Sequence, residues 1–281
     1  MNKVGMVILC YNNGKIIMEN IKKMNEYKCI DTILIVDNSS TDKSYEVLKE
    51  IENDKIKIIK NDVNSGYAAG NNVGLKYLEE NEYTYAFIMN PDVIVDNNSL
   101  NKIINAMKED KEYAILGCIR TSLNDVYDQS QFWNIPEFID EFRSYFFITR
   151  RLDTKKEIKF LKCENKIKEV GVVPGCLFLI NLDIAEKVGN FDEKTFLYYE
   201  ENILAKKIKN AGYKSGIVLN AKYIHNHQKS SSKNANQKFI KNNLYNSKKY
   251  YDNTYLKINR FQKMMLNILN KINKIERGIH E

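Results

Sequence analysis

The chain has 281 residues, a formal net charge of +7 from 43 Lys and Arg against 36 Asp and Glu, and a hydrophobic share of 43%. These values describe an ordinary globular protein with room for a substantial core, as one large domain or a domain with an appendage. Five scattered cysteines without a Cys-x-x-Cys pair exclude a zinc site and a persuasive disulfide framework, and favour a reducing compartment. No run approaches the roughly 20 apolar residues that span a bilayer, so we expect a cytoplasmic protein.

The positive charge is concentrated near the C-terminal end. From Lys222 onward, 13 Lys and Arg stand against 3 Asp and Glu. Such a segment suits an anionic surface, either phospholipid or nucleic acid. It lacks a folded motif that would give nucleic-acid specificity, so nucleic acid is not an expected partner.

Strand and helix patterns alternate through the first 120 residues. Apolar runs predict strands at 4–10, 32–36, 56–59, 85–89 and 113–119. Helical spacing of apolar residues predicts helices between them, the last of which runs to Met107 and is capped by Ser99. This alternation predicts an α/β fold with a mostly parallel central sheet and helices on both faces.

The segment that ends at Asp92 indicates a functional position. A strand-length apolar run from Tyr85 to Met89 stops abruptly at Asn90 and Pro91. Pro91 lacks the amide N–H needed to continue a strand, and ligands collect at the carboxyl ends of parallel strands. The pattern predicts a carboxylate presented at a strand end, with an ordinary turn as the alternative.

A glycine-rich segment precedes that strand. Gly66, Gly70 and Gly74 recur at intervals of four and lead into a helix that carries Leu75 and Leu78. The dinucleotide fingerprint requires Gly-x-Gly-x-x-Gly directly after the first strand of its unit. The spacing found here therefore disfavours an oxidoreductase.

The second half of the chain is less regular. Residues 120–169 are rich in aromatic and charged side chains and are compatible with a helical insertion or a lid. Periodic order returns at 170–180, Asp183 is expected to cap a short helix, and a short strand is predicted at 214–219.

Two adjacent carboxylates, Glu200 and Glu201, begin a predicted helix. The helix dipole favours ionised carboxylates at that end. The position suits a catalytic base and equally suits helix capping.

The C-terminal residues carry a heptad-type apolar seam on a lysine-rich helix. Its spacing alternates between three and four residues, and the stripe needs to be buried. Three partners fit this period: the chain's own domain, a second subunit in a homodimer, or a membrane surface. The seam consists of Ile258, Phe261, Met265, Ile268, Ile272, Ile275 and Ile279.

Taken in order, these motifs resemble glycosyltransferase family 2, the inverting group with the GT-A fold, and within it the rhamnosyltransferase-like branch. The resemblance covers about residues 3–231. It implies a transferase domain at 1–231, with a nucleotide-sugar-binding half (1–119) and an acceptor half (120–231), and a basic amphipathic helical tail at 232–281. The motifs are Tyr11-Asn12, residues 36–42, residues 64–74, Asn90-Pro91-Asp92, Pro174-Gly175-Cys176, Phe191-Asp192-Glu193, residues 196–201 and the late histidines.

The resemblance implies a nucleotide site in which the Asp37 carboxylate accepts a hydrogen bond from the pyrimidine N–H. A turn or helix cap is the structural alternative for Asp37. The residues implied for this site are Tyr11, Asn12, Asp37, Ser39, Gly66, Asn71 and Asn72.

By the same resemblance, Asp92 is the metal-binding carboxylate of the family's Asp-x-Asp motif, with Asn90 in place of the first aspartate. Mg²⁺ or Mn²⁺ accepts one protein carboxylate supplemented by phosphate oxygens and waters. Either His225 or His227 is expected to complete the metal site or to contact the diphosphate, and an incidental surface loop is the alternative.

Glu201 corresponds to the family's catalytic base, which is usually the Asp of a Glu-Asp pair. The longer side chain leaves Glu200 as the alternative base. The implied function is inverting transfer of a sugar from a dTDP- or UDP-sugar to a lipid-linked or polysaccharide acceptor in cell-surface polysaccharide synthesis. The protein would then be cytoplasmic, and the tail would bring it to the inner face of the cell membrane. The departures at Asn90 and Glu201 keep open a non-catalytic nucleotide-sugar-binding module or a subunit of a partner transferase.

Overall fold

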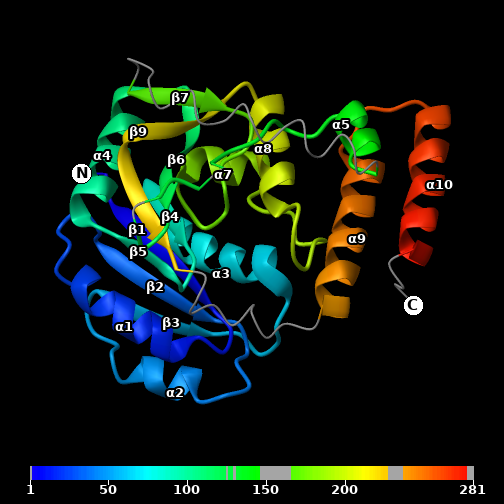
Figure 1. The fold of residues 1–281 in the computed structure, drawn as a ribbon. Coiled ribbons are helices and arrows are strands. Elements are labelled where there is room, and N and C mark those ends of the chain that lie inside the picture. Colours follow the sequence, from blue (N-terminus) through cyan, green and yellow to red (C-terminus); the bar gives the residue numbers. More distant parts are fainter. Residues whose placement is uncertain (1, 125, 129–130, 146–165, 227–236, 277–281) are drawn as a thin grey trace.

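The computed structural model describes residues 2–124, 126–128, 131–145, 166–226 and 237–276. Its centre is a sheet in the order β3-β2-β1-β4-β8-β6-β9-β5, with β7 paired to β9 (Figure 1). The strands are β1 (Val4–Cys10), β2 (Thr32–Asp37), β3 (Ile56–Lys60), β4 (Tyr85–Met89), β5 (Val93–Val95), β6 (Tyr113–Thr121), β7 (Ile167–Val170), β8 (Leu177–Asn181) and β9 (Lys214–His225).

Strand direction divides this sheet into two parts. β3, β2, β1 and β4 are parallel to one another. β8 runs antiparallel to both β4 and β6, whereas β9 is parallel to β6 and antiparallel to β5 and β7. The predicted α/β fold class is confirmed, but the sheet is uniformly parallel only in its first part because β8 reverses the direction in the middle.

Helices cover both faces of the sheet, as predicted. One face is covered by α1 (Gly14–Met24), α2 (Ser44–Lys49) and α4 (Asn97–Glu109), and the other by α3 (Gly66–Glu80), α7 (Leu182–Val188) and α8 (Glu200–Asn210). In α1, the apolar residues Ile17, Ile21 and Met24 share one face by their helical spacing, and all three are buried.

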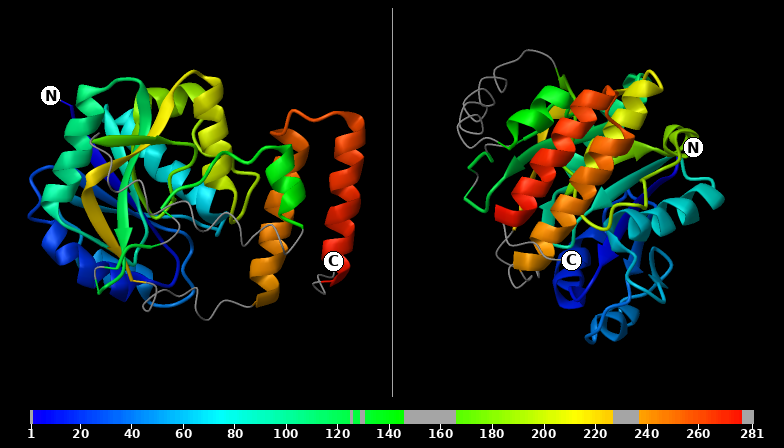
Figure 2. Two further views of the ribbon diagram at one scale, coloured as in Figure 1. Left: turned by 45° about the horizontal axis from the view of Figure 1, so that its top comes forward. Right: turned by 90° about the vertical axis from the view of Figure 1, so that its right-hand side faces the viewer.

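Three further helices stand together beside this α/β core, with α10 outermost (Figure 1). They are α5 (Phe138–Arg143), α9 (Gln237–Thr254) and α10 (Arg260–Glu276). Figure 2 shows the group from two more directions. A small apolar cluster that includes Ile203 of α8, Tyr251 of α9 and Leu266 of α10 joins it to the core.

Two predicted helix caps are displaced by a few residues. The side chain of Asp96 accepts a hydrogen bond from the Ser99 amide at 2.8 Å, so Asp96 is the cap of α4 and Ser99 lies in its first turn. The side chain of Asn181 accepts from the Ile184 amide at 3.3 Å, so Asn181 caps α7 and Asp183 lies inside it. Both cases follow the rule that an Asn or Asp cap bonds an amide two or three residues ahead.

β9 is longer than the predicted strand at 214–219 and extends to His225. Its pairing with β6 shifts register between Cys118 and Ile119, where the partner changes from Val218 to Lys222. This irregularity interrupts the apolar alternation that the prediction used, and it places His225 at a strand end instead of in a surface loop.

The seam in the C-terminal helices has no cover for most of its length in the described part of the chain. α10 packs inward through Leu266 and Asn270, whereas Phe261, Ile268 and Ile272 of the seam are 46–65% exposed. The predicted boundary at residue 231 lies outside the described residues. Within the described residues, no helix combines the length and the apolar content that crossing a bilayer requires.

Candidate active site

The strand register brings most of the predicted site residues to one edge of the sheet. Cys10 pairs with Asp37, and Met89 pairs with Leu177 at the start of β8. β6 is antiparallel to β8, and β9 is parallel to β6. β9 therefore runs in the same direction as β4, and its carboxyl end at His225 also lies at this edge. Ligand sites form at this position in α/β sheets.

Asp37 is fully buried at the end of β2. One carboxylate oxygen accepts a hydrogen bond from the Ser40 amide at 3.2 Å. The other, Oδ1, is buried and makes no hydrogen bond within the described residues. A buried acceptor without a partner is costly, so Asp37 is prepared to accept a ligand N–H, in addition to its role in the turn.

The two loops beside Asp37 are held in an unusual backbone conformation. Asn12 and Ser39 both have a φ of +59°, which is rare for side chains larger than glycine. The Asn12 amide donates to Ser40 Oγ at 2.9 Å, and its side-chain oxygen accepts from the Thr41 amide at 2.8 Å. These hydrogen bonds fix the loops relative to each other, while the adjacent Tyr11 side chain is exposed.

Asn38 was not predicted as a site residue, although it is buried at the centre of these loops. Its side-chain nitrogen donates to Asn64 Oδ1 at 2.9 Å and to the Gly66 carbonyl at 3.1 Å, and its oxygen accepts from Asn61 at 3.1 Å. Asn38 therefore ties the loop after β2 to the start of α3. Its position inside the motif at residues 36–42 was the available signal.

Gly66 is required by the conformation of the chain at the start of α3. Its φ is +93°, and a Cβ there would lie 2.3 Å from the carbonyl oxygen of Phe196. The next residue, Tyr67, donates its amide to that same carbonyl at 2.8 Å and its hydroxyl to the Gly175 carbonyl at 2.6 Å. The start of α3 thus joins the predicted donor site to the loop that leads to Glu200.

The two asparagines of α3 have different surroundings. Asn71 is buried, and its Oδ1 makes no hydrogen bond within the described residues. Asn72 donates to the Phe191 carbonyl at 3.0 Å and to Glu193 at 2.8 Å, and accepts from the Phe191 amide at 3.0 Å. The Asn72 side chain is therefore occupied in holding α3 against the segment that contains Phe191.

Asp92 and His225 meet at the carboxyl edge of the sheet. His225 Nε2 lies 3.1 Å from Asp92 Oδ1, and the pair is held by a hydrogen bond from the Asn226 amide to the Asp92 carbonyl at 2.9 Å. Burial lowers the pKa of His225, but Asp92 and Cys176 outweigh it and raise that pKa to about 9. His227 lies outside the described residues.

Cys176 is a further component that the sequence indicated only as part of a motif. The thiol is buried, lies 2.7 Å from the Tyr223 hydroxyl, and lies 3.9 Å from a guanidinium nitrogen of Arg120. Burial acts to raise its pKa, but His225 and Arg120 outweigh burial and lower that pKa below its ordinary value. His225 thus interacts both with Asp92 and with the Cys176 thiol.

Glu200 and Glu201 begin α8, as predicted. Glu200 is 4% exposed, and its Oε2 makes no hydrogen bond within the described residues. Burial, followed by repulsion from Glu201, raises the pKa of Glu200 to about 8. Glu201 is only half-buried and lies against Gly175, and burial also raises its pKa.

The two residues before this pair are strained. Tyr198 and Tyr199 have φ values of +74° and +69°, and neither is glycine. Such conformations cost about 1–3 kcal/mol each and persist where the surrounding structure holds them, most often at functional sites. Four of the six non-glycine residues with positive φ in the described chain are Asn12, Ser39, Tyr198 and Tyr199.

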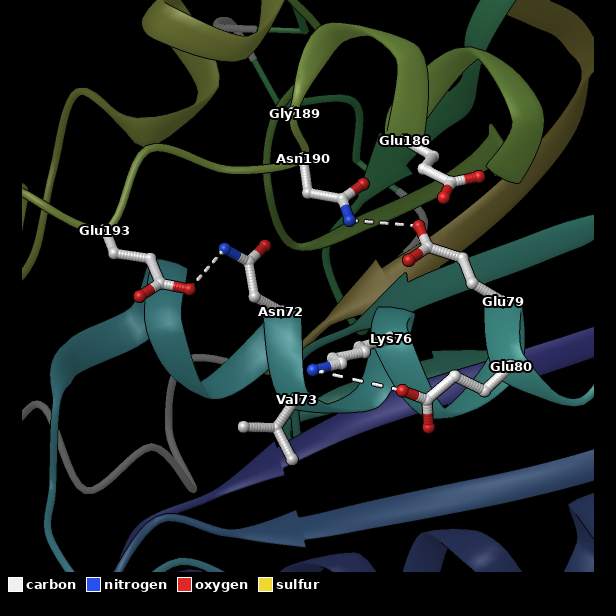
Figure 3. A pocket seen from close by; sticks show the side chains of 9 residues that line it. All are labelled: Asn72, Val73, Lys76, Glu79, Glu80, Glu186, Gly189, Asn190 and Glu193. Atoms are coloured by element: carbon white, nitrogen blue, oxygen red, sulfur yellow. Dashed lines mark hydrogen bonds and ion pairs between the residues drawn. The ribbon is translucent and has the colours of Figure 1, made fainter.

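A surface cavity of about 570 Å³ lies elsewhere, between α3 and the end of α7 (Figure 3). Its lining shares only Asn72 with the predicted site. Four glutamates face one lysine there, and Asn190 donates to Glu79 at 2.9 Å. The excess of negative charge disfavours a diphosphate, so we do not assign the donor site to this cavity.

Two described side chains fit a divalent cation, namely Asp92 and His225. Carboxylate and imidazole are ligands that suit Mn²⁺, and His225 must lose its proton before it can bind a metal. No group of three or more His, Cys, Asp or Glu side chains among the described residues is arranged to hold a metal ion. A metal here would therefore depend on ligands supplied by the substrate.

The mixed sheet, its covering helices and the polar residues at its carboxyl edge define a GT-A-type glycosyltransferase fold. The chain belongs to glycosyltransferase family 2, because the family model described as "Glycosyl transferase family 2" matches residues 6–186.

Individual relatives agree with this membership. The chain is 26% identical over 186 residues to the low-salt glycan biosynthesis hexosyltransferase Agl10 of Haloferax volcanii, a match that covers 65% of this chain and 55% of the relative. The chain thus spans about half the length of that curated relative.

Solved structures share the fold at low identity. GalNAc-T7, solved with UDP, GalNAc and Mn²⁺, superposes with a TM-score of 0.61 at 15% identity, over 81% of this chain and 44% of that one. TarS of S. aureus superposes with a TM-score of 0.58 at 13% identity, over 98% of this chain and 72% of that one. The second match is long enough to include α9 and α10.

Proposed function

We propose that the protein is an inverting glycosyltransferase that moves a sugar from a dTDP- or UDP-sugar to a lipid-linked or polysaccharide acceptor. The observation that carries this proposal is the placement of an unpartnered buried carboxylate oxygen of Asp37 at the same sheet edge as the Asp92–His225 pair. Tyr67 links that edge to the Glu200–Glu201 pair. The curated hexosyltransferase relative supports transfer of a hexose in glycan biosynthesis, and Asn90 favours the rhamnosyltransferase-like branch.

Each group has a chemical task in this reaction. Asp37 accepts the pyrimidine N–H of the donor, and Asn12, Ser39, Gly66 and the exposed Tyr11 shape the pocket around it. Asn71 and Asn72 belong to the same proposed nucleotide site, Asn72 by holding α3 in place. Glu201 removes the proton from the acceptor hydroxyl, whose oxygen attacks the anomeric carbon as the bond to the diphosphate breaks on the opposite face.

The protonation of the glutamate pair favours Glu201 as the base. Glu200 is the more deeply buried of the two, and with a pKa of about 8 it keeps its proton at neutral pH. Glu201 is the more exposed of the two, although burial raises its pKa as well, so Glu201 is the proposed base and Glu200 the alternative. Two interacting carboxylates with different exposure commonly divide the roles of acid and base in this way.

The proposed metal is Mg²⁺ or Mn²⁺ at Asp92 and His225. When bound, a divalent cation offsets the negative charge of the departing diphosphate. GalNAc-T7, which shares the fold, was solved with Mn²⁺. His227 stays a predicted contributor to the same site.

The test is nucleotide release from dTDP-rhamnose, UDP-glucose, UDP-galactose, UDP-N-acetylglucosamine and GDP-mannose, with Mn²⁺, Mg²⁺ or EDTA. Metal-dependent release from one donor is expected in the wild type, and Asp92→Ala should abolish it. Glu201→Gln should lower kcat by about 10² to 10⁴, whereas Glu46→Gln, an exposed change on α2, should not. Binding of a nucleotide without release, in the presence of any acceptor extract, would indicate the non-catalytic module instead.

We also propose that the exposed seam of α10 contacts the anionic inner face of the membrane. Phe261, Met264, Ile268 and Ile272 are exposed beside Arg260, Lys263 and Lys271. Apolar side chains flanked by basic ones suit the boundary between headgroups and acyl chains.

Partition onto phosphatidylglycerol vesicles tests this contact. The double variant Phe261→Ser with Ile268→Ser should lower partition at least tenfold, since burying each side chain contributes about 1.5–3 kcal/mol, while exposed Leu123→Ser should leave it unchanged. Unchanged partition of the double variant would contradict the proposal. A wild-type dimer in solution that the same variant dissociates would assign the seam to a second copy.

A further inference from the structure

The loop that leads to Glu200 is held from the C-terminal side of the chain. We call residues 190–199 the base loop. Tyr250 and Tyr255 both donate to Asp192 Oδ2, at 2.7 and 2.5 Å. Ser247 donates to the Leu197 carbonyl at 2.9 Å. α9 and the residue that follows it thus contact the base loop at two positions, Asp192 and Leu197.

The last residue of the base loop ends in a buried ionic cluster. The Tyr199 hydroxyl donates to both carboxylate oxygens of Glu141, at 3.0 and 3.1 Å. Lys248 donates to Glu141 and, at 3.0 Å, to Asp252. Glu141, Lys248 and Asp252 are 2%, 8% and 3% exposed, so water does not replace these contacts.

Asn270 of α10 extends the cluster and connects it to Tyr145, which follows α5. Asn270 of α10 donates to Asp252 at 3.3 Å and accepts from the Tyr145 hydroxyl at 2.5 Å. The Tyr199 ring packs on the Tyr251 ring with centroids 5.4 Å apart. α5 and α9 therefore contact Tyr199 directly, and α10 is connected to it through Asp252 and Lys248.

A buried cluster of this kind is a directional restraint. Taking charges out of water is expensive, and an apolar contact of the same volume would stabilise the fold as well or better. The charges add a defined geometry, because both oxygens of an ionised Glu141 can accept from the Tyr199 hydroxyl and Lys248 favours that ionised form. Burial raises the pKa of Glu141, and Lys248 opposes the rise.

The restraint acts where the backbone is strained. Tyr199 has a φ of +69° and directly precedes Glu200 and Glu201. Release of its side chain would let Tyr198 and Tyr199 relax toward ordinary φ values. The direction in which α8 starts, and with it the position of both carboxylates, would then change.

We propose that Tyr199 is a positioning residue for the catalytic base, and that α5, α9 and α10 act through it to set the geometry of Glu201. This inference rests on the proposed transferase function. It assigns to the C-terminal helices a role in the chemical step, separate from any contact of the α10 seam with a membrane.

The experiment compares Tyr199→Phe with Tyr83→Phe. Both changes remove one tyrosine hydroxyl and keep the ring, and Tyr83 donates to Thr32 at 2.7 Å near the opposite edge of the sheet. Tyr199→Phe should lower kcat at least tenfold and leave the donor KM and the nucleotide Kd within twofold of wild type. Tyr83→Phe should leave kcat within twofold. A kcat for Tyr199→Phe within twofold of an active wild type would overturn the inference.

A conservative pair separates positioning from stability. Glu141→Gln keeps an acceptor for the Tyr199 hydroxyl, whereas Glu141→Leu does not. The Gln variant should retain at least several-fold more kcat than the Leu variant when both are assayed well below their Tm. Equal kcat values would indicate a purely structural role and contradict the inference.

Amide hydrogen exchange in residues 196–203 tests whether Tyr199 restrains the base loop, and it needs no activity assay. Tyr199→Phe should speed exchange there at least tenfold and leave exchange in β1 and β2 unchanged. If the wild type turns over no donor, the proposed function fails, and this measurement still decides whether Tyr199 holds the base loop. Unchanged exchange would remove the inference whatever the activity.

Discussion

The donor side and the base side of this site are positioned by different means. On the donor side, the register of parallel strands places Asp37, and Asn12 is held by partners 28 and 29 residues away in the chain. On the base side, Tyr199 is held by a residue 58 positions earlier, Glu141, which is itself paired with Lys248, 107 positions later. The donor side depends on contacts between neighbouring strand–loop units, whereas the base side depends on contacts over larger separations in the chain.

The largest expected effect is the loss of stability when Lys248, the cation of the buried cluster, is replaced. Lys248→Met leaves Glu141 and Asp252 buried without an ammonium group, which should cost about 3–5 kcal/mol of unfolding free energy. Denaturant unfolding measures this loss, and exposed Lys249→Met on the same helix is the matched control. Adding Glu141→Gln and Asp252→Asn should restore part of the stability, and no restoration would indicate that lost packing dominates.

The next prediction is a gain of stability when Glu200 is replaced. Its pKa is raised from 4.5 to about 8 in the folded protein, so the folded state binds the proton more tightly and the wild type loses stability as pH rises from 4.5 to 8. Glu200→Gln removes this loss and should be more stable by about 3 kcal/mol at pH 7, at about 1.4 kcal/mol per pH unit. Below pH 4 the difference should vanish, and thermal unfolding at both pH values checks this sign.

A substitution on the proposed donor side should change nucleotide affinity and not the free energy of unfolding. Asp37→Asn replaces an acceptor-only oxygen pair, and loss of a hydrogen bond to a charged group costs about 1.5–3 kcal/mol, which weakens nucleotide affinity about 10- to 150-fold. Calorimetry with UDP and dTDP measures the change, and exposed Asp54→Asn is the control. If both variants bound the nucleotide with equal affinity, Asp37 would have only a structural role in its turn.

The smallest expected effect is the energy of the contact between Gly66 and Phe196, where the two sides of the site meet. Gly212→Ala adds a Cβ at φ +86° with no atom within 4 Å, so it should cost only the conformational penalty of about 1 kcal/mol. Gly66→Ala adds the same strain plus the contact with Phe196, about 1–3 kcal/mol more. The difference between the two unfolding free energies isolates the contact, and equal values would mean that the base loop moves freely away from α3.

The sequence locates the residues of the proposed donor half well, for a physical reason. Parallel strands there end in polar residues, so apolar runs and the residues that follow them, such as Asp37 and Asp92, can be located without knowledge of distant contacts. Element boundaries near Asp96 and Asn181 are wrong by a few residues because several neighbouring side chains are capable of capping. The extension of β9 to His225 is missed because an irregular register hides the alternation.

The base side could be predicted only in part. Glu200 and Glu201 are visible as a carboxylate pair at a helix start, but nothing local marks Glu141 or Lys248 as their support. A charged residue in an irregular segment or on a lysine-rich helix is normally solvated. Burial of Glu141 and Lys248 results from the packing of α5, α9 and α10 in one cluster, which no periodicity encodes.

The separation of Glu141 from Lys248 also has a consequence for the order in which the molecule is made. Glu141 leaves the ribosome 107 residues before the lysine that balances it, whereas the strands around Asp37 are complete early and adjacent in the chain. Under the proposed function, a growing polypeptide would therefore complete the strands of its proposed nucleotide-binding half well before its base loop is fixed. We would then expect such a nascent chain to bind a donor before it is able to transfer the sugar.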